Sequence, residues 1–143
     1  MSKIAIVFWS GTGNTEAMAN YIAAGVRAAG GEAELLGPVD FSAGQLSAYS
    51  AVALGCPAMG SEVLEEMEFE PMFASLEGSL SGKRIALFGS YGWGDGQWMR
   101  DWCARCDHAG ANLLDENGLM VNGAPDADGE EVCKELGKKL AAW

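Results

Sequence analysis

The strongest constraint on the fold of this chain is a repeated alternation of short β-rich runs with helical patterns. Apolar and β-branched residues concentrate in five runs, at residues 4–9, 32–36, 51–56, 84–88 and 118–121. The first, third and fourth runs are almost continuously apolar, which is typical of parallel strands covered by helices on both faces. The second run alternates charged and apolar residues, which indicates an edge strand. The pattern therefore predicts an α/β fold.

Helical patterns fill the intervals between these runs. Met18, Ile22 and Val26 recur every four residues, and the Gly-Gly pair at residues 30–31 is typical of a helix end. Asp126 and Asp128 are candidate caps of a last helix. Further helices are expected at residues 42–48 and 68–76 and around residues 98–102.

Five parallel strands joined by right-handed crossovers predict a doubly wound five-stranded sheet, with strand order 2-1-3-4-5 and helices on both faces. A chain of 143 residues has the usual length of one domain, so we expect a single domain over residues 1–143. Ligands of such sheets bind beyond the carboxyl ends of the strands, here where strands 1 and 3 diverge. The loops after strands 1, 3 and 4 are therefore expected to form the site.

The charge and hydropathy of the chain limit the classes of partner that it is expected to bind. A formal net charge of −11 argues against nucleic acid, because nucleic-acid binding depends on Lys and Arg neutralising phosphates. The same charge would steer the chain toward a basic protein surface, although an acidic composition is also common among proteins that are merely soluble. No apolar run approaches the ~20 residues of a membrane span, so we expect no membrane insertion and a cytoplasmic location.

The four cysteines are Cys56, Cys103, Cys106 and Cys133, too few for a disulfide framework in a chain with its own core. Cys103 and Cys106 form a C-x-x-C pattern, but Asp107 follows where haem attachment needs His, and no second pair completes a zinc site. Residues three apart on a helix share one face, which explains the pair by packing. We therefore expect reduced thiols and no metal site.

Three unusual segments follow the first, third and fourth predicted strands. They are SGTGNT at residues 10–15, CPAMGSE at residues 56–62 and GSYGWGDG at residues 89–96. Because the predicted topology brings these strand ends together, the three segments are expected to form one site.

The first segment joins a buried strand to a helix N-terminus and offers hydroxyl groups, an amide and glycine-freed backbone N–H groups, which together form an anion cradle. It lacks the Lys of a nucleotide-binding P-loop, and Glu16 stands where a dinucleotide-binding motif needs its third glycine. A terminal phosphate monoester therefore fits better. The alternative is a tight turn with a well-capped helix.

The other two segments are suited to a flat ring. Trp93 lies between two glycines beside Tyr91, and an aromatic on such a turn favours stacking on a planar heterocycle, typically worth ~1–3 kcal/mol. Met59 would cover the opposite face, and Gly60 could turn its carbonyl toward a ring nitrogen at little steric cost. The alternatives are a Trp93 folded back onto the helix and a plain Pro-Gly turn.

At these residues the chain closely resembles the short-chain flavodoxins of anaerobic bacteria. WSGTGNTE at residues 9–16, GCPAMGSE at residues 55–62 and FGSYGWGDG at residues 88–96 carry the resemblance, which extends over nearly the whole chain. It implies a low-potential one-electron carrier that holds FMN non-covalently and cycles mainly between semiquinone and hydroquinone. It also implies electron transfer to and from larger redox enzymes, with no catalytic residue of its own and no metal.

The resemblance also implies roles for individual residues. The first segment would bind the FMN phosphate, Met59 and Trp93 would flank the isoalloxazine, the Gly60 carbonyl would face flavin N5, and Glu62 would bind N3. Ser61 stands where some relatives carry Asp, which bears on the strength of the N5 hydrogen bond. The whole expected cofactor-binding set is Ser10, Gly11, Thr12, Gly13, Asn14, Thr15, Pro57, Ala58, Met59, Gly60, Ser61, Glu62, Ser90, Tyr91, Gly92, Trp93, Gly94 and Asn122.

Acidic residues near the expected ring would disfavour the anionic, fully reduced flavin. They are Glu62, Glu65, Glu66, Glu68, Glu70 and Asp95, with no cation nearby in sequence. The expected partners are redox enzymes with basic docking surfaces, and the chain is expected to be a monomer.

Two other classes of protein remain open. An FMN-dependent oxidoreductase of the same fold would need a second substrate pocket, and no spare long loop is evident. A phosphorylated signalling domain would need an Asp after the third strand, where the chain has Cys56 and Pro57.

Overall fold

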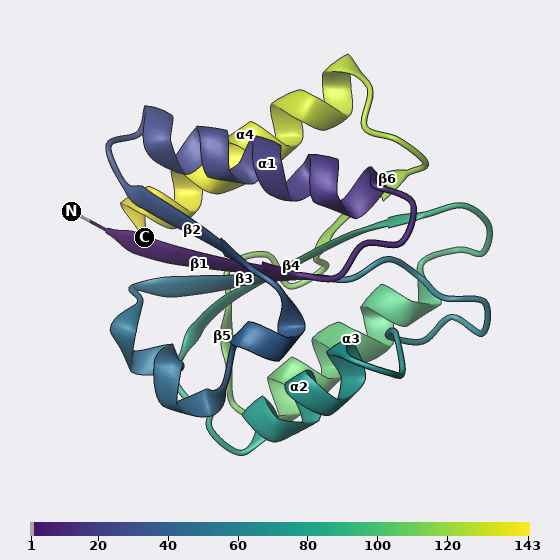
Figure 1. Ribbon diagram of the computed structural model, residues 1–143, viewed down its shortest axis with the longest axis horizontal. Helices are drawn as coiled ribbons and strands as arrows, with labels where there is room; N and C mark the ends of the chain where they lie inside the picture. The colour runs from purple at the N-terminus through teal and green to yellow at the C-terminus, as the bar shows by residue number, and fades with distance from the viewer. Residues whose placement is uncertain (1) are drawn as a thin grey trace.

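A parallel β-sheet forms the centre of the molecule, which a computed structural model describes over residues 2–143 (Figure 1). Its strands are β1 (Lys3–Phe8), β2 (Glu32–Leu36), β3 (Ala51–Gly55), β4 (Arg84–Tyr91), β5 (Asn112–Leu113) and β6 (Leu119–Asn122). The strand order is β2-β1-β3-β4-β5, and β6 also pairs with β4. The predicted order 2-1-3-4-5 is confirmed.

The sheet has a sixth strand in addition to the five predicted, because two short strands share the fifth position at its far edge. β5 pairs with Arg84 and Ile85, whereas β6 pairs with the later part of β4, from Phe88 to Tyr91. Between them the chain leaves the sheet in a turn, in which the N–H of Gly118 donates to the carbonyl of Asp115 and Gly118 has a φ of 71°. The run predicted at residues 118–121 corresponds to β6, whereas the two-residue strand β5 before this turn was not predicted.

Helices cover both faces of the sheet (Figure 1). α1 (Asn14–Ala28) and α4 (Ala127–Ala142) lie on one face, and α2 (Phe69–Glu77) and α3 (Gln97–His108) lie on the other. The helix expected at residues 42–48 is a 3₁₀-helix, η2 (Ala43–Ala48), which follows the short 3₁₀-helix η1 (Pro38–Asp40). Asp126 caps α4 as predicted, since its carboxylate accepts the N–H of Gly129 at 2.9 Å.

The strands place alternate side chains in two separate cores. Ile4 and Ile6 pack with the buried residues of α1 and α4, whereas Ala5 and Val7 pack with those of α2 and α3. Burial on both faces explains why β1, β3 and β4 are apolar throughout. None of the helices within residues 2–143 combines the length and the apolar character that membrane crossing requires.

α1 and α4 approach each other closely because glycines stand at their crossing. A Cβ on Gly25 would lie 2.0 Å from the carbonyl oxygen of Lys134, and a Cβ on Gly137 would lie 2.1 Å from that of Ile22. This contact fixes the helix whose N-terminus faces the site, because α1 begins directly after the loop that follows β1.

Candidate functional site

The loops after β1, β3 and β4 meet at one end of the sheet around a cavity of about 290 Å³. Its lining residues are Trp9, Gly11, Thr12, Asn14, Pro57, Ala58, Met59, Ser90, Tyr91, Gly92 and Gly123. Backbone pairing continues from the strands into these loops, since the N–H of Trp9 donates to Gly55 and that of Ala58 donates to Ser90, both at 3.0 Å. The parallel sheet therefore positions all three loops.

The loop after β1 presents polar groups at the N-terminus of α1. Ser10 Oγ accepts the N–H groups of Gly13 and Glu16, each at 3.2 Å, and Gly13 takes a left-handed φ of 98° as the cap of α1. Thr12 and Asn14 line the cavity itself. The free N–H groups and the dipole of a helix N-terminus favour an anion at this end of the cavity.

Thr15 lies beneath the cavity rather than in its wall. Its side chain is buried and shares a hydrogen bond with Ser90 at 3.1 Å, which joins the first turn of α1 to the end of β4. Thr15 therefore supports the polar loop from below. Ser90 both lines the cavity and forms the hydrogen bond with Thr15.

The loop after β3 ends in a tight turn over residues 59–62. The N–H of Glu62 donates to the carbonyl of Met59 at 2.9 Å, and the N–H of Met59 donates to Val63 at 3.1 Å. Gly60 and Ser61 lie exposed at the tip, and a Cβ on Gly60 would meet nothing within 4 Å. Glu62 is the only residue other than glycine with a positive φ, 55°, within residues 2–143.

The carboxylate of Glu62 spans from this turn to the loop after β4. Oε2 accepts the backbone N–H of Trp98 at 2.9 Å, and Oε1 occupies the space beside Gly94, where a Cβ would lie only 1.8 Å away. Gly94 has a left-handed φ of 89°. Glu62 therefore links two walls of the site, and Gly94 leaves room for its side chain.

The loop after β4 supplies aromatic residues. Tyr91 lines the cavity and packs against the buried Trp98, with ring centroids 5.7 Å apart. Trp93 is 65% exposed, so its ring is not buried against α3. Asn122 lies beside this loop, where its side-chain amide donates to the carbonyl of Gly92 at 3.4 Å.

Two lining residues were not among the expected set. Trp9 follows β1 directly, and its ring lies 3.1 Å from the position of a Cβ on Gly11. Gly123 follows β6, and its N–H donates to Tyr91 at 2.8 Å. The position of Trp9 next to Ser10 in the sequence could have identified it as a residue of the candidate site. Of the expected set, Ser10, Gly13, Thr15, Gly60, Ser61, Glu62, Trp93, Gly94 and Asn122 lie around the cavity without lining it.

The expectation that the nearby acidic residues lack a cation was wrong. Asp95 pairs with Arg100 at 3.0 Å, and Glu70 pairs with Arg105 at 2.6 Å. The buried Glu65 accepts three backbone N–H groups. The pairing of Glu70 with Arg105 was not visible in the sequence because the two residues are 35 positions apart, whereas Arg100 lies only five positions after Asp95. Glu66 and Glu68 are exposed and form no ion pair within residues 2–143.

All four cysteines are free and buried. Burial raises the pKa of the Cys103 thiol to about 11 and the pKa values of the other three thiols to about 12, so all stay protonated near neutral pH. No group of three or more potential metal ligands occurs within residues 2–143. Cys103 and Cys106 share the buried face of α3, as the packing interpretation predicts.

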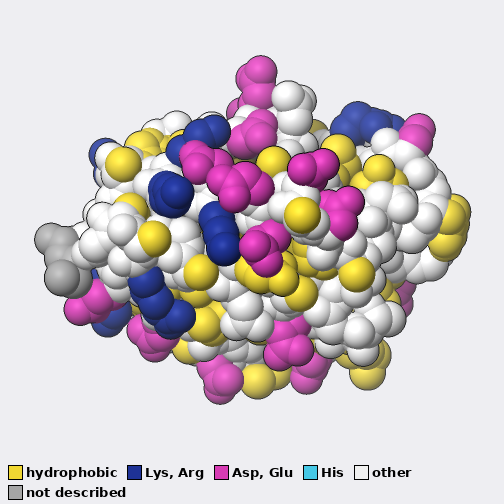
Figure 2. Space-filling model, turned by 90° about the horizontal axis from the view of Figure 1, so that it is seen from above, with side chains coloured by type: hydrophobic (Ala, Val, Ile, Leu, Met, Phe, Trp, Pro, Cys, Tyr) yellow, Lys and Arg dark blue, Asp and Glu magenta, His cyan; other side chains and the backbone are white. Residues whose placement is uncertain are grey.

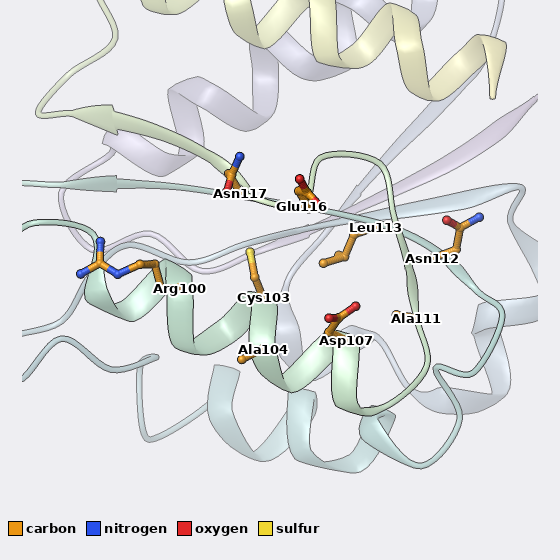
Figure 3. Close-up of a pocket in the computed structure, with 9 residues that line it drawn as sticks. All are labelled: Arg100, Cys103, Ala104, Asp107, Ala111, Asn112, Leu113, Glu116 and Asn117. Atoms are coloured by element: carbon orange, nitrogen blue, oxygen red, sulfur yellow. The ribbon is translucent and has the colours of Figure 1, made fainter.

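Two larger hollows lie at the interrupted edge of the sheet, away from the three loops. One, of about 560 Å³, separates α3 from residues 111–117, and Cys103 projects into it from α3 (Figure 3). The other, of about 760 Å³, lies on the α4 side of the same segment. Arg100, Asp107 and Glu116 give the first hollow mixed charge. Both hollows lie beside the turn that separates β5 from β6, and we interpret them as gaps in the packing at the edge of the sheet. The volume of a hollow therefore does not identify the functional site.

The chemistry of the loop cavity fits a phosphorylated planar ring. Hydroxyl, amide and helix N-terminal N–H groups gather at one end, and Trp9, Met59 and Tyr91 supply aromatic and thioether surface beside them. Phosphate favours the first set of groups, and a flat heterocycle favours the second. FMN combines both.

Comparisons with known proteins agree with this chemistry. A family model described as Flavodoxin matches residues 6–137. Flavodoxins from Megasphaera elsdenii and Clostridium beijerinckii are each 48% identical to the chain; the matches cover 96% and 95% of it and 98% and 97% of the relatives.

Solved structures agree as well. The solution structure of two-electron reduced Megasphaera elsdenii flavodoxin matches with a TM-score of 0.88, covering 98% of this chain and 99% of that one. A flavodoxin from the domain Archaea, 26% identical, matches with a TM-score of 0.86 over 98% of this chain and 96% of its own. The chain therefore belongs to the flavodoxin family, whose members are FMN-binding electron-transfer proteins rather than enzymes.

Proposed function

We propose that this protein carries single electrons on non-covalently bound FMN, cycling mainly between the semiquinone and the hydroquinone, and serves larger redox enzymes. The observation that carries the proposal is the meeting of the loops after β1, β3 and β4 at one cavity, polar at the α1 end and aromatic beside β4. We take residues 1–143 as one FMN-binding domain, an assignment that the two cores on one sheet support.

For the phosphate we propose the loop that precedes α1. Thr12 and Asn14 line the cavity, Ser10 and Gly13 shape the turn, and Thr15 supports it from below. Gly11 leaves space beneath the Trp9 ring. FMN supplies the redox chemistry when it is bound, and these groups would hold its negative end.

For the ring we propose the other two loops. Met59, Trp93 and the neighbouring Pro57 and Ala58 would cover its faces, and Glu62 would accept the N3–H. Gly60 would present its carbonyl to N5, a role supported by its exposed place at the tip of a turn. The remaining contacts would come from Ser61, Ser90, Tyr91, Gly92, Gly94 and Asn122.

The charge around the ring supports a low potential for the second electron. Glu62, Glu66 and Glu68 lie on one segment that contains no Lys or Arg. Adding an electron to a flavin beside unpaired carboxylates is unfavourable, and the effect grows where water is excluded. Because Asp95 and Glu70 are paired with arginines, we assign the effect to Glu62, Glu66 and Glu68 alone.

We further propose that the partners dock with basic surfaces over the exposed edge of this site. Met67 is 84% exposed and Trp93 is 65% exposed, and the carboxylates of Glu66 and Glu68 flank Met67 in sequence. On the face formed by α1 and α4, by contrast, acidic and basic side chains are mixed (Figure 2). A basic partner would therefore dock at the edge of the site rather than on the face formed by α1 and α4.

We also propose a monomer located in the cytoplasm. The four free cysteines support the cytoplasm, because thiols stay reduced in a reducing compartment. The net charge of −11 supports the monomer, because copies of like charge repel each other.

Stepwise dithionite reduction of the purified protein, followed by absorbance, tests the proposed function. We expect a yellow protein that turns blue as the neutral semiquinone accumulates and then pale. A colourless protein that binds no added FMN would overturn the proposal. Rapid oxidation of NADPH by the protein alone would favour the FMN-dependent oxidoreductase instead.

A further inference from the structure

The loop after β3 is closed at its base by two buried residues, Cys56 and Glu65. Cys56 Sγ accepts the N–H of Glu65 at 3.4 Å, and the thiol donates to the carbonyl of Pro57 at 3.6 Å. The side chains of Cys56 and Glu65 are 0% and 5% exposed. The chain therefore leaves and re-enters the interior at a single hydrogen-bonded point.

Cys56 is itself fixed to the rest of the site. Its N–H donates to the carbonyl of Phe88 at 3.1 Å, and its carbonyl accepts the indole N–H of Trp98 at 3.1 Å. The close approach of Gly89, where a Cβ would lie 2.2 Å from the Cys56 carbonyl oxygen, allows this packing. The base of the loop is thus held to β4 and α3, the elements on either side of the loop that carries Trp93.

Glu65 fixes the other end of the loop to α2. One carboxylate oxygen accepts the N–H groups of Glu68 and Phe69 at 2.8 and 2.9 Å, and the other accepts that of Met67 at 2.7 Å. Three backbone donors on one carboxylate hold residues 65–69 in a single arrangement.

The turn over residues 59–62 lies between these two anchors. Its hydrogen bonds are nested inside the base, first Met59 with Val63 and then Met59 with Glu62. The peptide after Gly60 stands exposed at the tip. The carboxylate of Glu62 holds one side of the turn to Trp98, and the bond between Cys56 and Glu65 closes the loop below it. The position of the tip relative to the cavity therefore depends on the base as well as on Glu62.

We propose that Cys56 and Glu65 are positioning residues that set the place of the turn at Gly60, and through it the stability of the half-reduced flavin. This inference rests on the proposed function, because it concerns the same turn. Burial raises the pKa of the Cys56 thiol to about 12, so the thiol remains protonated and acts through hydrogen bonds, without redox chemistry.

The test compares Cys56→Ala with Cys56→Ser. The two variants remove nearly the same volume, but only serine keeps an acceptor for the N–H of Glu65 and a donor for Pro57. Cys133→Ala and Cys133→Ser are the controls, because Cys133 is equally buried, lies in α4 and makes no hydrogen bond through its thiol within residues 2–143. The readout is the semiquinone formation constant from a redox titration.

We expect the semiquinone formation constant of Cys56→Ala to be about fivefold lower than that of Cys56→Ser, the effect of about one hydrogen bond. Both Cys133 variants should equal the wild type. Equal constants for the two Cys56 variants, with FMN still bound, would overturn the inference and leave the proposed function intact. A wild type that binds no FMN would overturn the proposed function.

Two further measurements apply if Cys56→Ala does not fold or FMN does not bind. Glu65→Gln should also lower the semiquinone constant, whereas Glu131→Gln, at an exposed position of α4, should not. Hydrogen exchange of the Glu65 N–H needs no flavin, and we expect protection in the wild type and in Cys56→Ser. Exchange as fast as that of the exposed Ser61 N–H would overturn the inference.

Discussion

The carboxylate of Glu62 accepts the backbone N–H of Trp98 at 2.9 Å and thereby joins the loop after β3 to the first turn of α3. Glu62 adopts a left-handed φ of 55° to make this contact, a conformation that non-glycine residues seldom take. A single side chain thus holds two walls of the candidate site together, with its second oxygen directed beside Gly94.

Replacing Glu62 with Gln separates the two bonds of this side chain. The amide oxygen can still accept the N–H of Trp98, but its NH₂ group cannot accept the flavin N3–H. We expect FMN binding to weaken by about 1.5–3 kcal/mol, the range for a hydrogen bond to a charged group. Titration of the apoprotein with FMN measures the change. Glu116→Gln, at an exposed position between β5 and β6, is the control, and an unaltered dissociation constant for Glu62→Gln would contradict the proposed contact.

Replacing Gly60 with Ala is expected to lower the semiquinone yield. In the present turn the added Cβ meets nothing within 4 Å, so the variant should fold normally. The cost, roughly 1–2 kcal/mol, would arise only when the peptide after Gly60 turns its carbonyl toward N5. A redox titration measures the yield. Gly44→Ala also meets nothing within 4 Å and is the control; an unchanged yield in Gly60→Ala would rule out the flip.

Replacing Trp93 with Ala tests the stacking partner. Because the indole is 65% exposed, its loss should cost little stability. FMN binding should weaken by ~1–3 kcal/mol and flavin emission should recover, since both depend on stacking. Trp143→Ala, at the C-terminal end beside Arg84, is the matched control. Emission as weak as in the wild type would place another residue over the ring.

The sheet and its order were predictable because burial on both faces makes β1, β3 and β4 apolar throughout, a local property of the sequence. The meeting of the three loops of the candidate site was also predictable. They follow β1, β3 and β4, and the carboxyl ends of neighbouring parallel strands lie at the same edge of the sheet. The run at residues 118–121 predicted β6, but β5 was not predictable, because its two residues are too few to carry a period of their own.

Ion pairs between different helices could not be predicted from the sequence either. Arg105 lies in α3, yet its guanidinium binds Glu70 at 2.6 Å and Glu77 at 2.7 Å, both in α2, and lies 4.7 Å from the ring centre of Phe73. No spacing in the sequence specifies which two helices lie side by side. Such contacts decide which carboxylates near the site remain unpaired, so the electrostatic prediction needed the structure.

The crossing of α1 and α4 gives a prediction about stability. Gly25→Ala would place a Cβ 2.0 Å from the backbone carbonyl of Lys134, and backbone atoms cannot move aside as a flexible side chain can. We expect a loss of about 2–3 kcal/mol in the free energy of unfolding. Urea unfolding of the apoprotein measures it, with Gly78→Ala, which meets nothing within 4 Å, as the control. Equal stability of the two variants would show that the helices separate without cost.

The buried carboxylate of Glu65 gives a prediction about acid stability. Burial alone would raise its pKa, but the N–H groups of Phe69, Glu68 and Met67 together lower the pKa below the ordinary 4.5. A carboxyl whose pKa is lower in the folded protein binds protons more tightly when unfolded, so its contribution is complete above about pH 4.5. That contribution is lost as the pH falls through the folded pKa.

Glu65→Gln should therefore be less stable than the wild type near neutral pH, by about 1–2 kcal/mol for a weakened helix cap. The difference should shrink on acidification, because the wild type loses the charged cap and the variant has none to lose. Urea unfolding of both apoproteins between about pH 7 and about pH 3.5 measures this. Glu131→Gln, exposed on α4, should follow the wild type throughout. A gap between Glu65→Gln and the wild type that stays constant across this range would mean that the Glu65 carboxyl keeps an ordinary pKa in the folded protein.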